Sequence, residues 1–230
     1  TSFLSTVYVA RMIVPDDPPV HEARERPKLA TIVRLVSERR PFVNITANTL
    51  VFNIAVWMGT PLQPIYFVRE LHASDGWLGL WLGLISGGAI LGNLIWPRLI
   101  DRRGYSWVLR RATLLSALYY FLIGLFPNLN LILIFAVFYG AVSPGVDISH
   151  FNTLLEVCDP RRRTVYLSVF VTLMNVGFFL AALGAAPLVD AYGAQSLVLV
   201  LGGVRVFGAL LFVVNPVRAQ SIETTPANVT

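Results

Sequence analysis

Residues 77–96 read WLGLWLGLISGGAILGNLIW, an apolar stretch of 20 residues without a charged side chain. An α-helix rises about 1.5 Å per residue, so roughly 20 apolar residues are needed to cross the ~30 Å hydrocarbon core of a bilayer. Ser86 and Asn93 are the only hydroxyl and amide side chains in the stretch, too few for a helix that faces water. The stretch therefore predicts a membrane-spanning helix.

The composition of the whole chain agrees with this prediction. Of its 230 residues, 55% are apolar or aromatic and only 13% are charged, with a mean hydropathy of +0.65. Soluble domains carry roughly 25% charged residues, and disordered chains have low hydrophobicity. Cys158 is the only cysteine, so an intrachain disulfide framework is excluded. The composition favours an integral membrane protein.

Five further stretches have the same character, and short loops rich in Gly, Pro, Asn or Asp separate them. The apolar runs lack the sustained alternation expected of membrane β-strands. We therefore predict an all-α polytopic membrane protein with six transmembrane helices. The predicted spans are 42–68, 77–96, 108–126, 129–154, 165–189 and 196–214.

The basic residues predict the orientation of these spans. Sixteen of the 18 Lys and Arg residues lie on one side of the predicted membrane, whereas only Arg69 lies on the other and Arg205 lies inside the last span. Cytoplasmic loops carry the excess of Lys and Arg. We expect both termini of the segment in the cytoplasm and the protein in the cytoplasmic (plasma) membrane. The net charge of +5 is thus a topology signal, and no nucleic-acid partner is expected.

Four segments follow from this pattern. Residues 1–14 read as the end of a preceding transmembrane helix, 15–40 as a cytoplasmic linker, 41–216 as the six-helix bundle and 217–230 as a cytoplasmic tail. We interpret the chain as the C-terminal part of a longer protein. The alternative is a six-span protein with a clipped end.

A short pattern occurs twice, three spans apart. The second span ends in LIDRRG at 99–104 and the fifth in LVDAYG at 188–193, both of the form L-[IV]-D-x-x-G. Because three is odd, the two copies end on opposite sides of the membrane, and only the cytoplasmic copy contains arginines. This predicts a 3+3 inverted repeat, a common plan of transporters, although so short a match can arise by chance.

The stretch PRLIDRRG at 97–104 resembles the G-x-L-x-D-R-x-G signature of the major facilitator superfamily. Leu99, Asp101, Arg102 and Gly104 match, while Pro97 replaces the first glycine. The sequence DPRRR at 159–163 is similar to the P-x-x-R loop of the same family, and the basic linker resembles the connection between its halves.

This resemblance implies one half of a twelve-helix secondary active transporter that works by alternating access. The solute would bind between this bundle and an N-terminal six-helix half. Leu99, Asp101, Arg102 and Gly104 would form a cytoplasmic gating motif, with Gly104 in a tight turn of positive φ. The competing interpretation of these four residues is a solvated turn that only fixes orientation.

Charged groups inside apolar spans are costly and are functional candidates by default. Asp147 and His150 share one face of the fourth span with Ser143, beside the Pro144–Gly145 break. They could relay protons or bind a cation, or Asp147 could be wet and paired with Arg while His150 is structural. For Arg205 we expect a buried ion pair with Asp147, and the alternative is binding of an anionic substrate group.

Two further spans carry uncharged polar residues. In the family that the chain resembles, the first span lines the central cavity, so its polar side chains are candidates for contact with the solute. For each polar residue in both spans, the alternative role is to hold neighbouring helices together by hydrogen bonds. The candidates are Asn48, Asn53, Trp57 and Gln63 in the first span, and Thr172 and Asn175 in the fifth.

The remaining chemistry is sparse. One cysteine and three scattered histidines predict no metal site, and we expect no cofactor and no enzymatic activity. The expected partners are a small solute, protons or a cation as candidates for coupling, the N-terminal half and the lipid bilayer. A six-span membrane scaffold or assembly protein without a transport cycle is the alternative function.

Overall fold

A computed structural model describes residues 37–214, apart from the side chains of Arg161, Ala186 and Asp190. The predicted helix end at 1–14, most of the linker at 15–40 and the tail at 217–230 lie outside the described residues.

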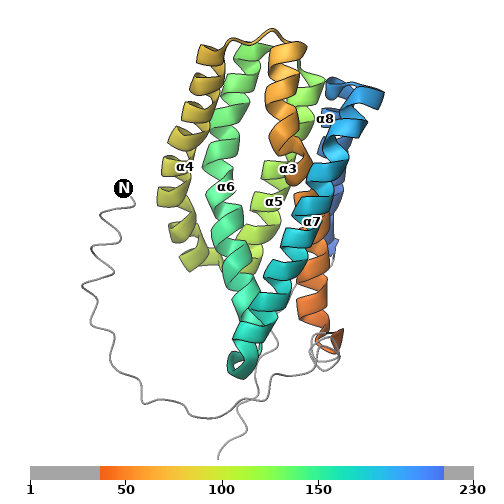
Figure 1. Ribbon diagram of the computed structural model, residues 1–230. Coiled ribbons are helices and arrows are strands. Elements are labelled where there is room, and N and C mark those ends of the chain that lie inside the picture. Colours follow the sequence, from red (N-terminus) through yellow and green to blue (C-terminus); the bar gives the residue numbers. More distant parts are fainter. Residues whose placement is uncertain (1–36, 215–230) are drawn as a thin grey trace, which may run out of the picture.

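Six long helices make up the described chain, and no strand occurs in it (Figure 1). All six are long and apolar enough to cross a membrane, which confirms the predicted fold class. Most of them extend beyond the predicted spans by several residues, because polar ends continue the helices past the apolar stretches. Their bounds are α3 Arg40–Arg69, α4 Asp75–Arg103, α5 Tyr105–Leu125, α6 Leu129–Val157, α7 Arg163–Tyr192 and α8 Ala194–Val214, with a 3₁₀ turn, η1, at Pro160–Arg162.

Capping residues explain where two of the helices begin. The Ser74 hydroxyl accepts a hydrogen bond from the Trp77 N–H at 3.2 Å at the start of α4. The Asn128 side chain accepts from the N–H groups of Asn130 and Leu131 at the start of α6. Such caps satisfy N–H groups that have no partner within the helix.

Single glycines connect α4 to α5 and α7 to α8. Gly104 has φ 80° and ψ 161°, and Gly193 has φ 78° and ψ 154°. This backbone region is essentially restricted to glycine. Both glycines donate to a carbonyl four residues earlier, Gly104 to Ile100 at 2.7 Å and Gly193 to Val189 at 2.9 Å. The two turns quoted from the sequence therefore have the same geometry.

The helices pack in a regular set of neighbours. The main pairs are α4 with α6, α3 with α7, α3 with α8, α5 with α6, and α5 with α8. The Glu70 carboxylate adds a link at one end, because it accepts hydrogen bonds from the N–H groups of Ala194 (2.9 Å) and Gln195 (3.3 Å) at the start of α8. The end of α3 is thus fastened to the beginning of α8.

Glycines bring some helix backbones into direct contact. A Cβ on Gly88 or Gly92 of α4 would collide with the backbone of α6 at Val137 and Ala141, and one on Gly140 of α6 would collide with Ile85. Gly79, Gly83 and Gly87 instead face open space. Small residues therefore serve close helix packing on one face of α4, and within the described bundle the other glycine face has no neighbour.

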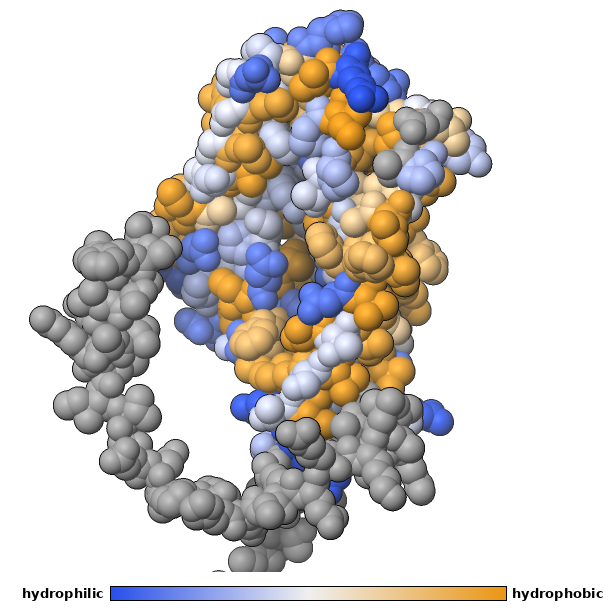
Figure 2. All heavy atoms as spheres, in the orientation of Figure 1, coloured by the Kyte–Doolittle hydropathy of each residue, from blue (hydrophilic) through white to orange (hydrophobic). Residues whose placement is uncertain are grey.

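Exposure is uneven among the helices. Only 17% of the most apolar window of α4 and 18% of that of α7 are buried, compared with 56% for α5. Figure 2 shows apolar side chains over much of one face, with a hollow near its middle that both hydrophilic and hydrophobic residues border.

Proline is distributed unevenly as well. Pro61 and Pro64 lie inside α3, Pro97 inside α4, Pro144 inside α6 and Pro187 inside α7. The sequences of α5 and α8 contain no proline. Each internal proline removes one hydrogen bond from the helical ladder.

Candidate functional site

Arg205 occupies the interior of the bundle, near the middle of α8. Its side chain is 3% exposed, and it is the only charged residue among the buried polar ones that the structure describes. Its Cζ atom lies 4.4 Å from the ring centroid of Phe52, 4.7 Å from that of Tyr120 and 5.7 Å from that of Tyr139. Aromatic rings from α3, α5 and α6 therefore surround the guanidinium.

The hydrogen bonds of Arg205 are incomplete. Nη2 donates to the Ser116 hydroxyl at 3.4 Å, whereas Nε and Nη1 have no acceptor in the part of the chain that the structure describes. We call Phe52, Ser116, Tyr120, Tyr139 and Arg205 the Arg205 cage. A buried N–H group without an acceptor is destabilising, so the cage holds unused donor capacity.

Asp147 lies on α6 with an exposed side chain. Arg205 acts on it electrostatically, but the guanidinium makes no hydrogen bond to its carboxylate within the described residues. The predicted ion pair is thus an interaction at a distance in this conformation.

His150, three residues further along α6, contacts α3. Its Nε2 lies 2.6 Å from the Thr49 hydroxyl oxygen, and that hydroxyl donates its own proton to the Ile45 carbonyl at 2.6 Å. A hydroxyl has a single proton to donate, so Nε2 of His150 must be the donor. The rings of Phe170 and Phe212 lie 5.7 and 6.5 Å from the imidazole. The helical period placed both residues on one face of α6, but Asp147 is exposed whereas His150 is half-buried against α3.

The amides of α3 differ from one another. Asn48 is 4% exposed and donates to the Leu211 carbonyl of α8 at 3.4 Å. Gln63 is also buried, and its Oε1 accepts from the Tyr119 hydroxyl at 3.4 Å, which in turn accepts from the Trp81 indole at 3.0 Å. Both amides join helices. Asn53 is only half-buried.

Trp57 of α3 and two polar residues of α7 complete the candidates. Trp57 is half-buried and packs edge-on against Phe178, with ring centroids 6.2 Å apart. Thr172 and Asn175 are exposed, and the Thr172 hydroxyl donates to the Ser168 carbonyl of its own helix at 2.8 Å. No hydrogen bond in the described chain joins either residue to the Arg205 cage.

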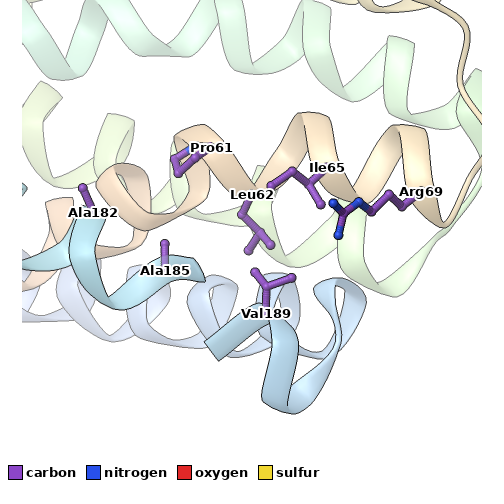
Figure 3. A pocket seen from close by; sticks show the side chains of 7 residues that line it. All are labelled: Pro61, Leu62, Ile65, Arg69, Ala182, Ala185 and Val189. Atoms are coloured by element: carbon purple, nitrogen blue, oxygen red, sulfur yellow. The ribbon is translucent and has the colours of Figure 1, made fainter. Parts of the chain in front are cut away.

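Two apolar grooves lie between α3 and α7. One of about 210 Å³ is open beside Arg69, and Figure 3 shows Leu62 of α3 and Val189 of α7 pointing toward each other across it. A second, of about 470 Å³, is lined by Leu50 and Ile54 of α3 and by Val176 and Leu180 of α7. The sequence did not predict either groove.

The four residues expected to form a gating motif lie at the end of α4. Leu99, Asp101 and Arg102 form the last turn of α4 and Gly104 ends it. Asp101 and Arg102 are exposed. The guanidiniums of Arg103 and Arg111 lie beside the Trp107 ring, 5.4 and 3.8 Å from its centroid.

Sequence reasoning missed the aromatic and hydroxyl members of the cage. Ser116 and Tyr120 are one helical turn apart in the third span, and Thr113 lies one turn before Ser116. That polar stripe was a usable signal. No group of three or more potential metal ligands occurs in the described residues.

A comparison with protein families adds to this geometry. The model of the Major Facilitator Superfamily matches residues 45–228. The chain belongs to the major facilitator superfamily. The resemblance carried by residues 97–104 is confirmed, and the chain is an integral membrane protein of a superfamily whose members are transporters of small solutes. A search of curated proteins gives no match to this major facilitator chain.

Proposed function

We propose that this chain is one six-helix half of a secondary active transporter, built as a 3+3 inverted repeat and working by alternating access. The observation that carries the proposal is the correspondence between α3–α4–α5 and α6–α7–α8. Exchanging the two triplets turns the pair α4–α6 into α7–α3 and the pair α5–α6 into α8–α3, and all four pairs are in contact. The matching glycine turns at 104 and 193 fall at corresponding positions.

Such an arrangement suits transport because rocking of one repeat or bundle against another can expose a midplane site to each side in turn. The sparsely buried helices α4 and α7 offer faces to an N-terminal half. Leu99, Asp101, Arg102 and Gly104 would latch the two halves on the cytoplasmic side, as the basic residues orient the bundle. The plasma membrane remains our proposed location.

The proposed solute path uses candidates that are at least partly accessible. Asn53, Trp57, Asp147, Thr172 and Asn175 have half-buried or exposed side chains. Asn48, Gln63 and His150 hold helices together by hydrogen bonds, so we assign them to the support of this path.

Single-cysteine labelling tests alternating access without knowledge of the solute. Cys158 is the only cysteine, and Cys158→Ser provides the background. In sided membrane vesicles, Asn53→Cys and Asn175→Cys should react with an impermeant maleimide from both sides. Adding Asp101→Asn should change the rate of labelling from the cytoplasmic side and the rate from the outside in opposite directions. Val200→Cys, exposed on α8, is the control and should stay unreactive in lipid.

Labelling of both pathway positions from one side only, unaffected by Asp101→Asn, would favour a static scaffold. The same vesicles test the orientation. Cysteines at Arg102 and Arg162 should react from the cytoplasmic side, and cysteines at Asn128 and Tyr192 from the outside.

A further inference from the structure

Arg205 poses a problem of charge compensation. Transfer of an ion from water to a low-dielectric interior is costly unless an opposite charge and hydrogen bonds accompany it. The cage offers Arg205 one acceptor, the Ser116 hydroxyl at 3.4 Å, and no carboxylate in contact. Arg205 is therefore a buried charge whose Nε and Nη1 donors have no acceptor in the described residues.

The aromatic rings satisfy only part of the guanidinium. Phe52, Tyr120 and Tyr139 lie around it at cation–π distances, and such contacts attract the charge to the ring face. The N–H groups at the edge of the guanidinium still need acceptors. The rings also fix its position, which lowers the ordering cost of binding a ligand at that edge.

We propose that Arg205 binds the carboxylate of a small organic monoanion, and that this anion and Asp147 compete for its single positive charge. The inference rests on the proposed transport function and names its substrate class. Arginine suits the role because its fixed donors match a carboxylate and because it stays protonated. A neutral or cationic solute would leave the buried charge uncompensated.

Asp147 links this site to protons. With Asp147 ionised, its field already offsets part of the charge on Arg205; with Asp147 protonated, the full charge is available to the anion. Proton uptake at Asp147 therefore favours anion binding at Arg205, and linkage requires the reverse as well.

Other titratable groups surround this pair. Tyr119 and Tyr120 on α5 and Tyr139 on α6 interact with one another and with Arg205, but phenols are neutral near pH 7. His150 on α6 donates through Nε2 to Thr49 of α3. Arg205 acts on Asp147 electrostatically, so Asp147 and His150 are the groups to separate by mutation.

The test measures thermal stabilisation of the full chain in lipid nanodiscs by formate, acetate and benzoate. Each has a neutral control of similar shape, namely formamide, acetamide and benzamide. At least one carboxylate should raise the unfolding temperature while its amide does not. The affinity of that carboxylate should fall as pH rises, by at most about tenfold per pH unit for one linked proton.

Variants assign the effect to residues. Arg205→Gln should abolish carboxylate stabilisation, and Arg111→Gln, which removes an exposed guanidinium from α5, should leave it unchanged. If Arg205→Gln does not fold, the Asp147→Asn variant tests the inference instead. Asp147→Asn should bind the carboxylate more tightly at neutral pH, and its affinity should no longer depend on pH. His150→Gln should keep the pH dependence of the affinity.

Three results would overturn the inference. They are equal stabilisation by an amide and its carboxylate, no stabilisation by any of the three carboxylates, and an unchanged pH dependence in Asp147→Asn. Cysteine labelling keeps this outcome separate from the proposed function. Two-sided labelling without carboxylate binding would leave alternating access standing and remove the anion site alone.

Discussion

The α4–α6 contact and the α3–α7 contact occupy corresponding places in the two triplets, yet they are built differently. Gly88, Gly92 and Gly140 bring the backbones of α4 and α6 against each other. Between α3 and α7 the contact runs through side chains, and two apolar grooves remain. Side chains can change rotamer and re-form contacts after a shift, whereas touching backbones cannot. The difference indicates that α4 and α6 move together, while α7 is freer to move against α3.

Substituting Gly140 should have the largest effect on this contrast. Gly140→Ala would place a Cβ against the Ile85 backbone, which cannot rotate away, so we expect a loss of roughly 3 kcal/mol, the upper end of typical overpacking costs. The buried Cys158 thiol is a natural reporter, because a thiol-reactive dye reaches it only on unfolding. Gly83→Ala, in open space on α4, is the control; equal losses at both positions would refute the backbone contact.

The two connecting turns should respond almost equally to substitution. Gly104→Ala and Gly193→Ala each force a side chain into a backbone region of positive φ, at a cost of about 1–3 kcal/mol. Thermal unfolding in detergent measures both. A loss at one turn and none at the other would break the correspondence between the triplets.

A milder result is expected on the α3–α7 side. A Cβ at Gly177 would lie 2.8 Å from Trp57 Cζ3 and 2.9 Å from Leu50 Cδ2, both of which are movable side-chain ends. Gly177→Ala should therefore cost no more than about 1 kcal/mol. The same dye assay compares it with Gly140→Ala, and a cost as large as at Gly140 would show that this contact is equally rigid.

The smallest effect should come from filling the groove beside Arg69. Ala182 lines it and is exposed, so Ala182→Leu adds apolar contact without a collision and should change stability by no more than about 0.5 kcal/mol. Its effect on labelling of Asn175→Cys is the sharper readout. Slower labelling with unchanged stability would indicate that α7 must move against α3.

The fold was largely predictable because helix length, loop composition and arginine placement are local signals. All six spans and both glycine turns follow from them. The candidate site was harder to predict from the sequence, because it depends on which residues of different helices lie in contact. The helical period of α6 placed Asp147 and His150 on one face, but it could not show that Thr49 of α3 lies within hydrogen-bonding distance of His150. Nor could a single span reveal that Phe52, Tyr120 and Tyr139 converge on Arg205.

The distribution of proline has a mechanical consequence. Four helices, α3, α4, α6 and α7, contain internal prolines and bend at lower cost where the ladder is interrupted. The uninterrupted helices α5 and α8 touch each other through Gly202, whose Cβ would lie 2.8 Å from the Phe121 Cα atom. When the bundle changes conformation, the helices with internal prolines should therefore bend before α5 and α8 do. The α5–α8 pair is then the most rigid part of the bundle. The distance between spin labels on α5 and α8 should stay constant, while the distance between spin labels on α3 and α7 should change.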